Sequence, residues 1–125
     1  FLHPMLTNFD APSREDCTAD RLPSNSPQQA LTLLNDPTFY EAARVFGRRI
    51  VGARHLPSDD ERVAWAFERA LGRPPSARER SMLVGLLADE RTHFRARPDD
   101  ARKVAAVGLA SGTSDADAAE LAAWT

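Results

Sequence analysis

The densest group of polar side chains lies near the N-terminus, and it is the first place where a reaction would be sought. A carboxylate of Asp10 or Glu15 would act as a general base, and the Arg14 guanidinium would stabilise developing negative charge. The same groups would also cap helices and bind the backbone amides of an irregular segment. We favour this structural role, so Asp10, Arg14 and Glu15 are weak catalytic candidates. The cluster continues through Asp16, Cys17, Arg21, Asn25, Asn35 and Asp36.

Cysteine and histidine supply no recognisable site. Cys17 is the only cysteine, which excludes an internal disulfide and a CxxCH haem attachment motif in this sequence. It would be a nucleophile only beside a histidine that lowered its pKa, and no motif links it to His3, His55 or His93. We therefore expect a small buried apolar residue. The histidines lack ligand spacing such as HExxH, so the sequence predicts no cofactor-binding and no metal residues.

Arginines and tryptophans allow two further hypotheses. Either of two arginine clusters would bind an anion bidentately, but we favour the interpretation that these arginines lie on solvated helix faces. Tryptophan rings would stack on a carbohydrate if they were exposed, and core packing is favoured over that role. The residues concerned are Arg44, Arg48 and Arg49, then Arg91, Arg95 and Arg97, and the tryptophans Trp65 and Trp124.

Length and charge restrict the classes of protein. A chain of 125 residues with 42% hydrophobic and 27% charged residues is typical of one globular domain. The net charge of -2 argues against nucleic acid as a partner. No apolar run is long enough to span a bilayer, and no signal peptide pattern is present. Because the sequence starts at Phe1 without methionine, we expect a fragment of a larger protein.

Helix signals begin after a proline-bearing leader. Residues 1–26 predict an irregular arm, in which the apolar residues Phe1, Leu2, Met5, Leu6 and Phe9 would form a short helix or strap. Three capping boxes follow, each a serine with Gln or Glu three residues later, and the first has Pro27 at its opening helical position. They are Ser26 with Gln29, Ser58 with Glu61, and Ser76 with Glu79.

Apolar spacing predicts helices of 3.6-residue period and no strand. Asp36 would cap the second helix, and Gly72 would close the third in a left-handed conformation. The predicted ranges are 27–35, 37–53, 59–71, 77–96, 99–109 and a last helix from about 115. The core-facing residues would be Phe39, Ala43, Phe46 and Ile50; Val63, Phe67, Ala70 and Leu71; Leu83, Leu86, Leu87 and Phe94; Val104, Val107 and Leu109; and Ala118, Leu121, Ala122 and Trp124.

The fold class that follows is all-α. We expect an antiparallel helical bundle of about five to six helices, in a single domain that comprises the arm at 1–26 and the helices at 27–125.

Several motifs resemble a known family. The runs FDAPSRE at 9–15, CT at 17–18 and SNSPQQALTLLNDP at 24–37 are long and unusual, and LGRPPS at 71–76 and ELAAWT at 120–125 agree with them. Together they resemble the planctomycete-specific C-terminal domain of unknown function, family fifteen fifty-three.

The resemblance implies a setting but no activity. Proteins of this family are large and exported, to the periplasm or cell surface, and many carry an upstream cytochrome-c-like segment that binds haem c. The resemblance also implies that further sequence flanks this chain. We therefore expect a helical interaction or scaffold module that binds other domains of the same protein. The alternative is part of a haem-linked oxidoreductase or polysaccharide-processing enzyme with the N-terminal polar cluster near its site, and carbohydrate binding ranks last.

Overall fold

The computed structural model describes residues 3–12, 17, 19, 24–110 and 118–125. Within these ranges the chain forms seven α-helices and no strand, so the all-α prediction is confirmed. The chain divides into two compact units, residues 1–40 and 41–125. The expectation of a single domain stays a prediction.

The three predicted capping boxes are all present. The hydroxyl oxygens of Ser26, Ser58 and Ser76 accept hydrogen bonds from the backbone N–H three residues later, at 3.3, 3.2 and 3.3 Å. The backbone N–H of each serine in turn donates to the side-chain oxygen of the Gln or Glu three residues later, which is Gln29, Glu61 or Glu79. Each box satisfies amides that a helix start would otherwise leave without partners, and this fixes where the three helices begin.

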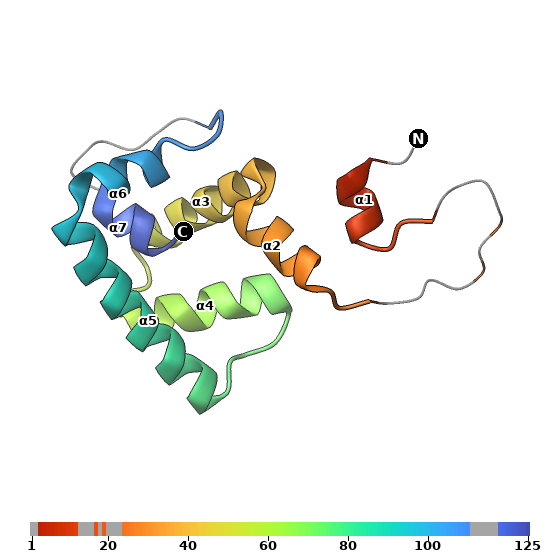
Figure 1. Ribbon diagram of the computed structural model, residues 1–125. Helices are drawn as coiled ribbons and strands as arrows, with labels where there is room; N and C mark the ends of the chain where they lie inside the picture. The colour runs from red at the N-terminus through yellow and green to blue at the C-terminus, as the bar shows by residue number, and fades with distance from the viewer. Residues whose placement is uncertain (1–2, 13–16, 18, 20–23, 111–117) are drawn as a thin grey trace. The chain divides into compact units, whose positions relative to one another are not determined.

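The first unit contains α1 (Pro4–Asn8), α2 (Pro27–Asn35) and the start of α3 (Pro37–Val51) (Figure 1). The predicted short helix of the arm is therefore present. It is joined to the next elements by the Phe9 and Phe39 rings, 5.8 Å apart, and by a 3.2 Å bond from Asn8 Nδ2 to Thr32 Oγ1. Phe1 and Leu2 lie outside the described residues.

The second unit contains the rest of α3, α4 (Asp59–Leu71), α5 (Ala77–Ala96), α6 (Pro98–Ala105) and α7 (Ala118–Ala123). Helix α5 contacts α4, α6 and α7 (Figure 1). The core is made largely of small residues, so α6 and α7 approach closely. Its buried members are Ala101, Ala105, Ala118, Leu121 and Ala122, with Phe94, Val104 and Ala119 packed against them.

Several core predictions are wrong. On α5, Leu87 is 5% exposed as expected, whereas Leu86 is 55% and Leu83 36% exposed. The helix buries the face that carries Val84, Leu87 and Phe94, and Leu86 projects from a different side. Ala70 and Leu71 at the end of α4 are likewise exposed, because no described helix covers that last turn.

Two glycines with positive φ lie at or just after helix ends. Gly72 closes α4 at φ 69°, as predicted. The expected helix at 99–109 instead ends at Ala105, and Gly108 takes φ 88° two residues after the Ala106 cap. The helix has ended before this left-handed residue, so Leu109 does not continue the apolar face of α6 and is fully exposed instead of buried. The antiparallel arrangement of the helices stays a prediction.

Candidate functional site

Asp10 closes the N-terminal arm onto the start of α2. Its carboxylate accepts hydrogen bonds from the Ser24 backbone N–H at 2.8 Å and the Ser24 hydroxyl at 2.7 Å. Gln29 Nε2, in the first capping box, donates to the same carboxylate at 3.5 Å. Asp10 itself has φ 57°, a left-handed conformation that aspartate tolerates in turns. These contacts are those of a residue that fixes a turn.

Other members of the predicted polar cluster also bind the backbone. Asn35 Nδ2 donates to Leu31 O at 2.8 Å, and Asp36 Oδ1 accepts from Thr38 N–H at 2.9 Å, which caps α3. Arg14 and Glu15 lie outside the described residues, as do Asp16 and Arg21, so a catalytic role for Arg14 or Glu15 stays a prediction. Cys17 lies in no regular element and is exposed, so the expectation of a buried cysteine is wrong.

Glu41 and Arg44 of α3 form a clamp on the end of α6 and the turn that follows it, residues 105–110, which the sequence did not predict. Glu41 Oε1 accepts hydrogen bonds from the backbone N–H groups of Leu109 and Ala110, both at 2.7 Å. Arg44 donates to the carbonyls of Ala105 at 3.3 Å and Ala110 at 2.9 Å. The two side chains therefore bind donors and acceptors of the same turn.

The clamp is closely packed. Arg44 has 0% exposed surface, so the expectation that it lies on a solvated face is wrong. Its Nε is buried without a hydrogen-bond partner in the described structure. Gly108 has φ 88°, a conformation that L side chains rarely adopt, and a Cβ there would lie 2.1 Å from Glu41 Cδ, so any substitution would strain the backbone and displace Glu41. In the sequence, burial of Arg44 could have been inferred from Gly47, which lies three residues later on the same face of α3. Gly47 packs on the Trp124 backbone.

A second network joins α4, α5 and α7 through Arg91, which was also expected on the wet side. Arg91 forms ion pairs with Asp59 and Glu120 while 18% of its side chain is exposed. Its Nη2 is 2.8 Å from Asp59 Oδ1, and its Nε is 2.9 Å from Glu120 Oε2. Glu120 also accepts from Trp124 Nε1 at 2.9 Å. Arg91 thus links three helices. Because its guanidinium donates to Asp59 and Glu120, it is not positioned to bind an external anion.

These contacts lower the pKa of both carboxyl groups. The hydrogen bond from Arg91 lowers the pKa of Asp59 below its usual range. Burial acts to raise the pKa of Glu120, but the hydrogen bonds from Arg91 and Trp124 outweigh it, and the pKa is lowered. A carboxyl group with a lowered pKa stabilises the folded state above its unfolded pKa, and that stabilisation is lost as the pH falls through the folded value.

We expect Arg91→Met to lower the free energy of unfolding by about 1–2 kcal/mol at neutral pH, after allowance for solvent screening. The deficit relative to the native chain should shrink as the pH falls below about 4, because the native chain then loses this stabilisation through the lowered pKa values of Asp59 and Glu120. Urea unfolding between about pH 2 and pH 7 measures it. Arg95→Met, on the same helix at an exposed position, is the control. Parallel pH profiles for the native chain and Arg91→Met would contradict the assignment.

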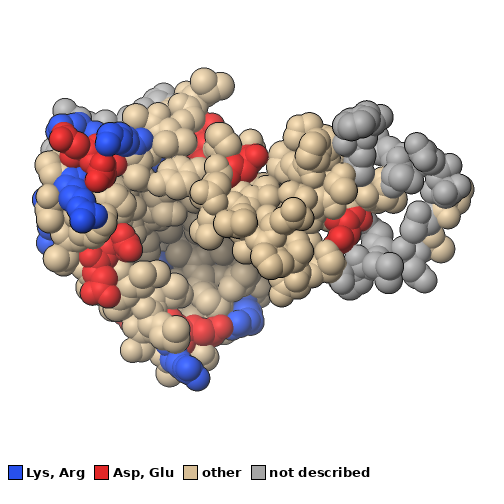
Figure 2. Space-filling view, in the orientation of Figure 1, with Lys and Arg blue, Asp and Glu red and all other residues tan. Residues whose placement is uncertain are grey.

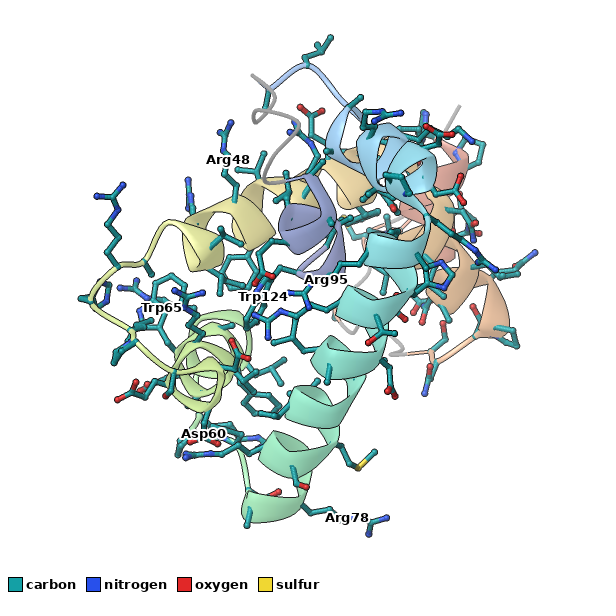
Figure 3. All side chains as sticks on the ribbon, turned by 90° about the vertical axis from the view of Figure 1, so that its left-hand side faces the viewer. Arg48, Asp60, Trp65, Arg78, Arg95 and Trp124 are labelled. Atoms are coloured by element: carbon teal, nitrogen blue, oxygen red, sulfur yellow. The ribbon has the colours of Figure 1, made fainter. Side chains whose placement is uncertain are left out.

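The tryptophans are part of the packing of the second unit. Trp65 stacks on Phe46 with ring centroids 6.1 Å apart, and the Arg69 guanidinium lies 5.4 Å from the Trp65 centroid. Trp124 is half-buried and bonded to Glu120. Figure 3 labels both tryptophans. Both are partly buried and contact residues of the same unit, which agrees with the packing role favoured from sequence.

The histidines and the remaining arginines are scattered. His3 caps α1 through Nδ1, His55 is exposed, and His93 packs edge-on against Phe94 at 5.1 Å. Within the described ranges no three His, Cys, Asp or Glu side chains come together as metal ligands. Arg49, Arg95 and Arg97 are exposed, which agrees with a solvated role for them.

An open groove of about 430 Å³ lies where α4 and α5 begin. Its charged groups are bound to each other, because Arg80 Nη1 lies 2.8 Å from Asp60 Oδ2. Such a pair leaves little charge for a ligand to neutralise. The groove is lined by Asp60, Pro75, Ala77, Arg80, Ser81 and Val84.

The fold and these contacts define an all-α protein whose described polar clusters bind its own helices and turns. A family model described as Protein of unknown function (DUF1553) matches residues 1–87, more than half of the chain. The chain therefore belongs to this family, which is the one that its N-terminal motifs resemble. Comparison with curated proteins and with solved structures gives no match. No helix in the described part of the chain is long and apolar enough to cross a membrane.

Proposed function

We propose that this chain is a helical interaction module of a larger exported protein, and that it binds other domains of that protein without catalysing a reaction itself. The family resemblance supports the multidomain, exported setting and a haem-bearing neighbour. The contacts support the non-catalytic role, because Asp10, Glu41, Arg44 and Arg91 are all used to bind the chain's own helices and backbone.

The observation that carries the proposal is an apolar face on α2. Ala30, Leu31 and Leu34 lie on one side of this helix, and all three are exposed, Leu31 by 60% and Leu34 by 70%. The helix contains no ionisable residue. On the side in view, Figure 2 shows a surface over α1 and α2 that is nearly free of charged groups. Stable interfaces between domains are apolar in this way.

The test is binding between this chain and the remaining domains of the full-length protein, measured by calorimetry. We expect the native chain to bind and Leu31→Ser with Leu34→Ser to bind at least tenfold more weakly. Tenfold corresponds to about 1.4 kcal/mol, and one fully buried leucine contributes about 1.5–3 kcal/mol. Leu109→Ser removes a fully exposed leucine from the other unit and should bind like the native chain.

Two results would contradict the proposal. One is no association between the native chain and the other domains at about 100 µM, a concentration that detects weak interfaces. The other is an equal loss of binding in Leu109→Ser. Circular dichroism checks that each variant keeps its helices, which we expect because the replaced leucines are exposed.

A further inference from the structure

Helix α5 carries a second exposed apolar surface, and its charges indicate what covers it. Arg78, Met82, Leu86 and Glu90 follow one another at four-residue intervals, so they form one continuous ridge along the helix. Met82 is 63% and Leu86 55% exposed. At a rise of 1.5 Å per residue the ridge is about 18 Å long. It begins with a positive charge, continues with two apolar residues and ends with a negative charge.

This order is complementary to itself when it is reversed. If two such ridges lie side by side in opposite directions, Arg78 of each meets Glu90 of the other, and Met82 of each meets Leu86 of the other. A two-fold axis level with Val84 relates the two copies. Isologous contacts of this kind are the commonest form of homo-oligomer interface.

The charged ends of the ridge are available for such a contact. Arg78 and Glu90 form no ion pair within the described residues, whereas Glu79 is paired with Arg73 and Arg80 with Asp60. Figure 3 shows Arg78 extending away from the start of α5. Asp89 is exposed next to Glu90 and adds negative charge at the end that Arg78 of a second copy would reach.

Small residues beside the ridge provide a groove for the opposite ridge. Ser81 and Gly85 form the adjacent row on α5, and both are exposed. A Cβ placed on Gly85 would have no atom within 4 Å, so the helix surface is open there. Two helices whose four-residue ridges interlock cross at about 50°, the most frequent class of helix packing.

We propose that α5 is a self-association surface and that its partner is a second copy of this chain, paired through Arg78, Met82, Leu86 and Glu90. This extends the interaction role proposed above to a second surface, and it can fail while the α2 association holds. Pairing of one ridge from each copy buries less surface area than a standard protein–protein interface does. Dimers should therefore form only at concentrations on the order of 100 µM.

Sedimentation velocity between about 10 µM and 1 mM tests the pairing. We expect a monomer–dimer equilibrium for the native chain, and dimer dissociation constants at least tenfold higher for Arg78→Glu and for Glu90→Arg, because each variant places like charges opposite each other at both ends. An equimolar mixture of the two single variants should form heterodimers about as well as the native chain forms dimers. The double variant Arg78→Glu with Glu90→Arg should behave like the native chain.

Arg95→Glu is the matched control, since it makes the same charge change at an exposed position of α5 off the ridge, and it should not alter association. A native chain that stays monomeric at 1 mM would overturn the pairing, as would dimers that do not respond to the ridge variants. If the chain is monomeric but the ridge variants abolish binding to the other domains of the protein, the occupant of α5 is such a domain, and self-association is refuted while the interaction role stands.

Discussion

Arg44→Ala should lower the free energy of unfolding by about 3–5 kcal/mol, the range found when one partner of a buried charged contact is removed. The Arg44 side chain has no exposed surface, and it donates to the carbonyls of Ala105 and Ala110. In Arg44→Ala these carbonyls lose a charged hydrogen-bond donor, and a cavity remains where the arginine side chain was. Urea denaturation monitored by circular dichroism at 222 nm measures the change.

Arg49→Ala is the matched control, because it removes an exposed arginine from the same helix. It should change the free energy of unfolding by no more than about 0.5 kcal/mol. Arg44→Met keeps the apolar stem and removes only the donors, so it should lie between the two. Equal stabilities of Arg44→Ala and Arg49→Ala would show that the clamp on residues 105–110 does not stabilise the fold.

The second large effect is expected at Leu121, the centre of the core of the second unit. Leu121 on α7 is 1% exposed and packs among the small residues of α6 and α7. Leu121→Ala should reduce the free energy of unfolding by about 2–5 kcal/mol, because the transfer free energy of the lost atoms is added to the cost of a cavity that rigid helices cannot close. Thermal and urea unfolding both report this loss.

Leu109→Ala provides the same chemical change at a position that is 100% exposed. Its expected effect on the free energy of unfolding is within about 0.5 kcal/mol. The two variants differ only in burial, so the difference between them measures the packing of α7. A Leu121 variant as stable as the Leu109 variant would mean that α7 does not pack as the structure describes.

Helix starts were predictable from sequence because they depend on neighbours in the chain. A serine hydroxyl and the Gln or Glu three residues later need only one helical turn between them to form a capping box. Pro27 and Gly72 act through their own backbone preferences. The beginnings of α2, α4 and α5 therefore agree with the predicted ranges, whereas α6 ends early where a turn bound by Glu41 replaces helix.

The candidate site was less predictable, because the structural role of each polar group depends on distant residues. Arg44 resembles Arg48 and Arg49 in sequence, but its acceptors lie 61 and 66 residues further along the chain. Arg91 likewise looked like a surface residue until Asp59 and Glu120 were brought beside it. A charge on an amphipathic helix is solvated or buried according to which element covers it, and local spacing does not contain that information.

Sequence alone thus determined the all-α class, the helix starts and the family, since these depend on short-range hydrogen bonds, residue periodicity and linear motifs. Tertiary structure decided which face of α5 is buried. Apolar residues occupy more than one side of that helix, and contact with α4, α6 and α7 buries Leu87 but leaves Met82 and Leu86 in water. Only one side of a helix can face a given core, so a helix that is apolar on two sides leaves one side exposed, and packing determines which side that is.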